Sequence, residues 1–268
     1  MSLTTSRHSF VLSPRIFQAL LRSAICLMLF LPFSARANIF LDRNILVFPA
    51  HQRPIQNLKV TNGDSNNRTL AVHTEVKEVI NPGSEESQTI PSKALVVAPN
   101  AFELTPKQQR NVRILLREPN TSNRERVFRI NFLPRRPERS VVDNATGPEP
   151  TDAPAFKLNV LIGMGTLIFV LPREIDYRFE HQREADGKSI HFINHGNVSV
   201  HLQPRTICSY DNEDHCFRFE GMRVHPGLSR TYTVPEGFEK APLTFSVQSA
   251  GRHFALDVGA PAAPEAPE

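Results

Sequence analysis

The stretch FKLNVLIGMGTLIFVL, residues 156–171, ends at Pro172 and is the most apolar part of the chain after its first 37 residues. Its length would suit a helix, but Gly163 and Gly165 lie in its middle, and Val, Ile, Thr and Phe are frequent in it. Glycine is unfavourable inside helices, whereas β-branched and aromatic residues favour strands. The stretch is therefore predicted to be one strand, much longer than the usual length of about 5–6 residues.

Shorter runs on both sides of this strand alternate between apolar and polar residues with period two, and Gly, Pro or Asn residues close many of them. This pattern predicts an all-β protein built of sandwich domains. A polar, Pro-rich link at 135–155 is predicted to be a long exposed loop or to be partly disordered. The other strands are expected at 39–48, 58–61, 70–76, 95–97, 102–104, 112–116, 127–132, 177–179, 189–193, 198–202, 232–234 and 243–247.

Residues 1–37 have the pattern of a secretory signal peptide. Arg7, Arg15 and Arg22 precede an apolar stretch at 24–33, and Ala35-Arg36-Ala37 closes it with small residues at the positions that a signal peptidase reads. A membrane anchor is the alternative, but about ten apolar residues are too few to cross a hydrocarbon layer that needs about 20. We expect cleavage after Ala37, so that the exported chain begins at Asn38.

Removal of this segment takes away the apparent basic character of the chain, because it leaves 27 Lys and Arg against 27 Asp and Glu. A general nucleic-acid binder carries a basic surplus, so that class of partner is disfavoured. No later segment has 18 continuous apolar residues, and the exported chain is not expected to be embedded in a membrane.

Two cysteines remain after the signal, Cys208 and Cys216, and they predict one local disulfide in an exported chain. A metal site is the alternative, because Asp211, Glu213, Asp214 and His215 lie between them. The spacing differs from the C-x₂₋₄-C pattern of structural zinc sites, so the disulfide is favoured and no metal is expected.

The sequence has none of the catalytic and nucleotide-binding motifs G-x-S-x-G, H-E-x-x-H, P-loop or G-x-G-x-x-G. Gly163-Met164-Gly165 lacks the third glycine and lies inside the predicted strand. His191, His195 and His201 lie nearest one another among the ten histidines, but no acidic residue recurs with them. We therefore expect neither an enzyme nor a cofactor.

Several short motifs are weak singly, but their order and spacing are specific. In the first half they are NIFLDR (38–43), LVVAP (95–99), LTP (104–106), VRI (112–114), VFRI (127–130) and GTLIFVLPR (165–173). In the second half they are NHGN (194–197), the cysteine pair and HPGLSR (225–230). Together they resemble the periplasmic chaperones of the chaperone–usher pilus pathway, in the alternative branch that serves colonisation-factor and common-pilus fimbriae. The resemblance covers nearly all of residues 38–250.

The resemblance implies two immunoglobulin-like β-sandwich domains in a boomerang arrangement, residues 38–172 and 173–256. The low-complexity composition of the last residues predicts a disordered tail at 257–268. It implies a periplasmic chaperone that lends an edge strand to pilus subunits and delivers them to an outer-membrane usher. The free chain could also associate with itself. The stretch 156–171 would be the lent strand, and alternation places its subunit-binding residues on one face: Leu158, Val160, Ile162 and Met164.

Better-known members of this family hold the C-terminal carboxylate of the subunit with an Arg near the mature N-terminus and a Lys in the long strand. The matching positions here are Ile45 and Leu167, which are both apolar, as suits the alternative branch. A carboxylate in a partly dry cleft still needs a cationic partner. The candidates are Arg113 and Arg129, each opposite in parity to core-facing neighbours, and Arg173 beyond the long strand; for each, a solvated surface arginine is the alternative.

Two other functions remain open at this point. One is a secreted structural or adhesive β-sandwich protein of the pilus, although such subunits are usually single incomplete domains. The other is a carbohydrate-binding module or sandwich enzyme, which normally shows Trp or paired carboxylates in a groove, and this chain has no Trp.

Overall fold

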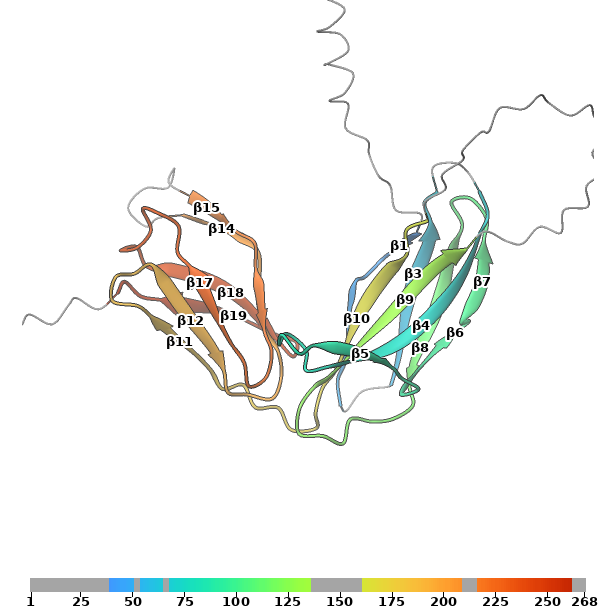
Figure 1. Ribbon diagram of the computed structural model, residues 1–268, viewed down its shortest axis with the longest axis horizontal. Coiled ribbons are helices and arrows are strands. Elements are labelled where there is room, and N and C mark those ends of the chain that lie inside the picture. The colour runs from blue at the N-terminus through green and yellow to red at the C-terminus, as the bar shows by residue number, and fades with distance from the viewer. Residues whose placement is uncertain (1–38, 51–53, 65–67, 136–160, 209–215, 262–268) are drawn as a thin grey trace, which may run out of the picture. The chain divides into compact units, whose positions relative to one another are not determined.

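The protein is described from a computed structural model, which covers residues 39–50, 54–64, 68–135, 161–208 and 216–261. The regular elements among these residues are strands, and the predicted all-β class with two sandwich domains is confirmed (Figure 1). The predicted signal peptide lies outside the described residues. Within the described ranges, no helix has the length and apolar character needed to cross a membrane.

The first domain consists of two sheets that enclose one core. One sheet has the strand order β1-β3-β8-β6, and the other has the order β2-β10-β9-β4-β5, with β7 also paired to β4. Its strands are β1 (Ile39–Leu41), β2 (Ile45–Phe48), β3 (Ile55–Asn62), β4 (Leu70–Ile80), β5 (Gln88–Pro91), β6 (Leu95–Ala98), β7 (Ala101–Leu104), β8 (Gln109–Leu116), β9 (Arg126–Arg135) and β10 (Met164–Val170).

Strand β9 shows how alternation builds this core. Phe128, Ile130 and Phe132 are fully buried, whereas Arg129 between them is exposed. Full burial of such an apolar side chain contributes about 1.5–3 kcal/mol. A one-residue slip of β9 would bring Arg129 into the core, so the alternation fixes the register.

The second domain has its own core between a sheet of order β11-β12-β17 and a sheet of order β16-β13-β18-β19, with the hairpin β14-β15 beside them. Its strands are β11 (Phe179–Arg183), β12 (Ser189–Asn194), β13 (Val200–Leu202), β14 (Arg205–Cys208), β15 (Cys216–Phe219), β16 (Met222–Val224), β17 (Ser229–Thr233), β18 (Leu243–Ser249) and β19 (Arg252–Val258).

Aromatic rings dominate the second core. Phe245 meets Phe192 and Phe219 edge to face, with ring centroids 5.4 and 5.1 Å apart. Tyr232 packs edge to face against Phe219 at 5.0 Å. Burial disfavours the phenolate and raises the pKa of Tyr232 to about 12. These rings supply the apolar area that a Trp supplies in many sandwich domains.

The predicted disulfide between Cys208 and Cys216 is confirmed. The two residues lie directly opposite each other in the antiparallel hairpin of β14 and β15, with their Cα atoms 3.9 Å apart. Both sulfur atoms are therefore used in the bridge, and the metal alternative is wrong for this pair. Residues 209–215, between the two cysteines, lie outside the described residues.

The long strand predicted at 156–171 is shorter where the structure describes it. Regular strand begins only at Met164, where pairing with Phe132 of β9 starts, and residues 161–163 precede it without regular structure. A strand is defined by its ladder of hydrogen bonds, so an apolar run cannot by itself set where the strand begins. Residues 156–160 lie outside the described residues.

Candidate functional site

Strand β10 is a sheet edge along part of its length. On one side β9 pairs with all of it, from Met164 to Val170. On the other side β2 pairs only with residues 167–170, in parallel, beginning with Ile45 opposite Leu167. In the described part of the chain, no strand pairs with residues 164–166 on that side. This open edge can accept the hydrogen bonds of an added strand.

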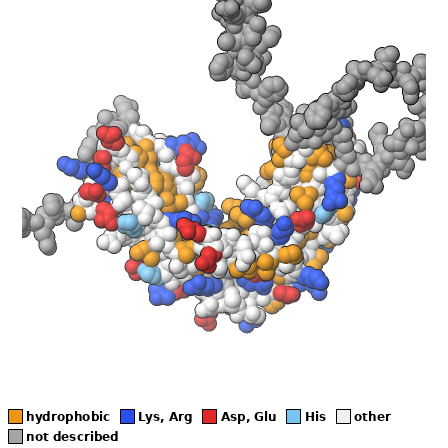
Figure 2. Space-filling model, viewed as in Figure 1, with side chains coloured by type: hydrophobic (Ala, Val, Ile, Leu, Met, Phe, Trp, Pro, Cys, Tyr) orange, Lys and Arg blue, Asp and Glu red, His pale blue; other side chains and the backbone are white. Residues whose placement is uncertain are grey.

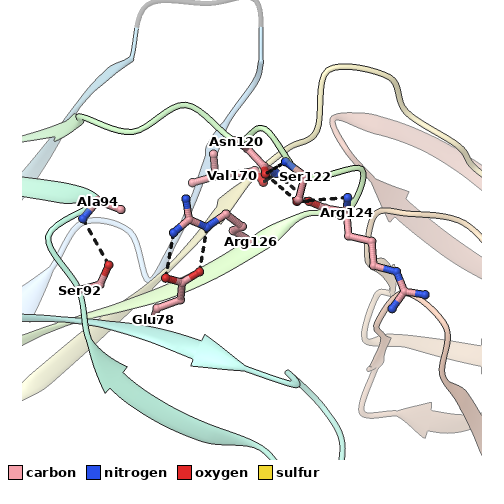
Figure 3. Close-up of polar contacts among 8 residues, drawn as sticks. All are labelled: Glu78, Ser92, Ala94, Asn120, Ser122, Arg124, Arg126 and Val170. Atoms are coloured by element: carbon pink, nitrogen blue, oxygen red, sulfur yellow. Dashed lines mark hydrogen bonds and ion pairs between the residues drawn. The ribbon is translucent and has the colours of Figure 1, made fainter.

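The other end of β10 is held firmly. The Leu171 amide donates to the carbonyl of Phe48 at 3.0 Å. The buried Asn120 side chain donates from Nδ2 to the carbonyls of Val170 at 3.1 Å and Arg124 at 2.7 Å (Figure 3). One amide thus bonds two backbone acceptors, and its bond to the carbonyl of Val170 is buried from water. The open edge is therefore presented by a strand fixed at its C-terminal end.

An ion pair braces the neighbouring strand β9 against β4. Arg126 donates from Nε and Nη2 to the two carboxylate oxygens of Glu78 at 2.8 and 2.9 Å (Figure 3). Both side chains are mostly buried, and the hydrogen bonds from Arg126 to Glu78 raise the pKa of this arginine although burial opposes the shift. A bidentate ion pair of this kind fixes the orientation of the two side chains and also stabilises the pairing of their strands.

The predicted subunit-binding face is only partly within the described residues. Leu158 and Val160 lie outside them. Ile162 is 37% exposed, whereas Met164 is partly buried and packs against the first domain's own core. Thr166, two residues further along this face, is fully buried. Along this face the side chains are therefore exposed before Met164, at Ile162, and buried after it, at Thr166.

The opposite face of β10 carries a row of residues from four adjacent strands. Leu167 lies beside Ile45 of β2 on one side and beside Arg129 of β9 on the other, and Arg129 lies beside Lys77 of β4. Arg129 is exposed. Lys77 Nζ lies 3.5 Å from a carboxylate oxygen of Glu75 on the same strand. Across the sheet from β2 to β4, the row therefore consists of two apolar side chains followed by two positively charged ones.

The other two candidate arginines lie elsewhere. Arg113 is exposed on β8 of the opposite sheet, between Asn57 of β3 and Ala98 of β6. Arg173 is exposed beyond β10 and lines a hollow of about 540 Å³ with residues 120–123 and Asp176. Of the three candidates, Arg129 alone shares a face with the positions of Ile45 and Leu167.

A hollow of about 580 Å³ lies next to this row. Its lining includes Ile45, Leu167, Arg129, Asn131, Leu133 and Gly165. In Figure 2, hydrophobic side chains gather on the first domain near the N-terminal end of β10, with Lys and Arg side chains close by. The surface therefore combines an apolar lining with positive charge, as a binding site for an apolar chain with an anionic end requires.

Sequence reasoning did not single out Lys77. The strand predicted at 70–76 ends one residue before it, whereas β4 continues to Ile80. The alternation of His73, Glu75 and Lys77 was the available signal, because it continues the outward face of the strand. Among the described residues, no group of three His, Cys, Asp or Glu side chains could hold a metal ion.

Comparisons with known proteins agree with this architecture. The model of a family described as pili and flagellar-assembly chaperone, PapD N-terminal domain, matches residues 38–175, just over half of the chain. A search of curated proteins finds no match.

Several solved structures share the fold at low sequence identity. The class 5 fimbriae chaperone CfaA is 19% identical with a TM-score of 0.51, and the match covers 82% of this chain and 98% of CfaA. The chaperone YadV is 12% identical with a TM-score of 0.54 and the same two coverages. A complex of the Salmonella enterica SafA pilin with the SafB chaperone gives 15% identity and a TM-score of 0.52, covering 84% and 98%. The chain belongs to the family of pili and flagellar-assembly chaperones.

Proposed function

We propose that this protein is a periplasmic chaperone that captures pilus subunits at the open edge of β10 and delivers them to an outer-membrane usher. The observation that carries the proposal is the edge at residues 164–166, beside a row of side chains that includes Arg129. The structures of SafA with SafB and of CsuC with CsuE are complexes of a chaperone with a pilin or tip subunit, and they support the same role here. Delivery to an usher and membership of the alternative branch are inferred from the sequence motifs alone.

Strand addition would carry the inward face of β10 beyond the first domain's own core. Thr166 and Ile168 of β10 point into the first domain. Two-residue steps back along the chain give Met164, Ile162, Val160 and Leu158. If a subunit extends the sheet along this edge, its own interior lies under those residues. Each one buried there contributes about 1.5–3 kcal/mol before the cost of ordering.

We infer that Arg129 binds the C-terminal carboxylate of the subunit, with Lys77 as a second positive charge. Strand β2 occupies the edge of β10 from Ile45 onward, so an added strand must end near that point. Arg129 lies on β9, across β10 from this end, and its guanidinium can form two parallel hydrogen bonds with a carboxylate. Lys77 is the next residue across the sheet. Arg113 and Arg173 are less suited, because neither lies on this face.

The decisive test of strand lending is Ile162→Asp, with Ile55→Asp as its matched control. Both isoleucines belong to the first domain and are similarly exposed, at 37% and 42%, but Ile55 lies on β3 of the other sheet. A charge at residue 162 would be desolvated inside the subunit, at a cost of several kcal/mol. We expect Ile162→Asp to lose co-purification of a co-produced pilus subunit, and Ile55→Asp to retain it.

The thermal transition of each free variant must be measured with the capture assay. If Ile162→Asp unfolds the chaperone, residue 162 belongs to an ordinary core strand and the lending role is wrong. Capture that survives Ile162→Asp in a folded chaperone contradicts the proposal equally.

A further inference from the structure

We propose that Gly163 and Gly165 form a notch, the glycine notch, that accepts a large apolar side chain from the end of the captured strand. This inference rests on the proposed function and adds a specificity determinant to it. Gly165, the second residue of β10, and Gly163, just before the strand, have no side chain, whereas Leu167 and Phe169 follow Gly165 on the face that carries the row of Ile45 and Arg129. The hollow of about 580 Å³ lies over them.

The backbone packs closely at both glycines. A Cβ atom on Gly163 would lie 2.9 Å from the carbonyl oxygen of Phe132 and 3.1 Å from Cδ2 of Leu133. A Cβ atom on Gly165 would lie 3.2 Å from Oδ1 of Asn131. These distances are shorter than ordinary van der Waals contact, so a side chain at Gly163 would require β9 to shift, and one at Gly165 would require the Asn131 side chain to give way by a few tenths of an ångström. The chain itself has no side chain at these two positions, and the hollow that they line is open to another molecule.

The direction of the backbone groups places an added strand beside the notch. The Leu167 amide donates to the carbonyl of Asn44 at 2.9 Å, on the β2 side of β10. Residues two apart in a strand point their amides and carbonyls to the same side, so Gly165 offers its groups to the open edge. Glycine also permits close approach of another backbone. An added strand therefore pairs beside Gly165, and its side chain there lies over the notch.

The chemistry of the lining selects the side chain. Leu133 and Leu167 flank the notch on one face, and Asn131 lies opposite Gly165 in the register. A glycine in a sheet leaves the apolar surface of its neighbours uncovered, and a large cross-strand ring can cover that surface. An aromatic side chain buries about 150–250 Å² when enclosed. Arg129 lies two residues from Asn131 on β9, about 7 Å along the strand, which places the carboxylate partner just beyond the ring.

The test uses strand-length peptides that end in a free carboxylate and carry either Phe or Ala at one of the last three positions. Their dissociation constants are measured for the full exported chain and for Gly165→Leu, with Gly165→Ala as a smaller change. The wild-type protein is expected to prefer Phe over Ala by at least about tenfold at one position. Gly165→Leu should remove that preference while binding of the Ala peptide continues, and Gly165→Ala should reduce the preference less.

The outcomes separate this inference from the proposed function. If the peptides bind in a carboxylate-dependent way but Gly165→Leu keeps the Phe preference, or if the wild type shows none, the notch is wrong and strand capture stands. If the wild type binds no peptide and captures no co-produced subunit, the proposed function fails, and the notch with it. Should Gly165→Leu fail to fold, an unchanged Phe preference in a folded Gly165→Ala overturns the notch, and a reduced preference supports it.

Discussion

At the scale of single residues, Arg113 and Arg129 are equivalent in sequence but not in structure. Each lies mid-strand between buried neighbours and is exposed. Period-two alternation gives the direction of a side chain relative to its own sheet, and that part can be predicted from sequence. It does not give the sheet to which the strand belongs. Only the pairing of β9 with β10 places Arg129 beside Leu167, while β8 carries Arg113 on the other sheet.

This difference predicts that Arg129→Ala weakens subunit binding and that Arg113→Ala does not. Loss of a charge-assisted pair with a carboxylate costs about 1.5–3 kcal/mol, so affinity should fall about 10- to 100-fold for Arg129→Ala. The measurement is the dissociation constant of a carboxylate-ended strand peptide, repeated with the amidated peptide. Arg129→Ala should lose the difference between the two peptides. Equal losses for the two variants would contradict the assignment of Arg129 as the anchor.

At the scale of elements, strands whose apolar and polar residues alternate strongly could be predicted from the sequence. Strands that are largely exposed and form only because a neighbouring strand supplies hydrogen bonds could not. The buried alternation of β9, with Phe128 and Ile130 inward, lies within the strand expected at 127–132. By contrast, β5 and β19 were not expected: β5 is fully exposed and its residues do not alternate, and β19 is exposed over most of its length although Phe254, Leu256 and Val258 alternate with other residues. They are strands because β4 and β18 supply hydrogen-bond partners. Lys77 was missed for the same reason, since the pairing of β4 with β9 extends the strand past the apolar alternation.

The fixed end of β10 provides a prediction at this scale. Asn120→Ala removes the side-chain donor of the buried hydrogen bond to the carbonyl of Val170, and leaving a buried acceptor unsatisfied costs about 1–3 kcal/mol. We expect the free energy of unfolding of the first domain to fall by that amount in urea titrations. Asn123→Ala, at an exposed position in the same loop, should change it by less than about 0.5 kcal/mol. If the two variants are equally stable, Asn120 does not hold the strand.

At the scale of the whole molecule, the structure has two separate hydrophobic cores, and the residues proposed to bind subunits all belong to the domain of the first core. The first core supports β9 and β10, which carry the open edge and Arg129. The second core contains the aromatic cluster and lies in the domain with the disulfide. The sequence predicted both the bridge and the second region of strands, because a cysteine pair in an exported chain and turn-bounded apolar runs are local signals. The open edge is not a local signal, since it depends on where β2 begins to pair with β10.

This division predicts that removal of the disulfide destabilises the second domain and spares subunit capture. The double variant Cys208→Ser/Cys216→Ser leaves neither cysteine of the bridge as a free thiol and should lower the free energy of unfolding of the second domain by about 2–3 kcal/mol. The chain has no Trp, and its three tyrosines are Tyr177, Tyr210 and Tyr232, so tyrosine fluorescence reports the second domain selectively. Its midpoint in urea should fall. Amide exchange of Ile130 and Ile168 in the first core should stay unchanged, as should binding of the carboxylate-ended peptide. An equal loss of protection in the first core would mean that the two cores unfold as one unit, and the proposed division of roles would then be wrong.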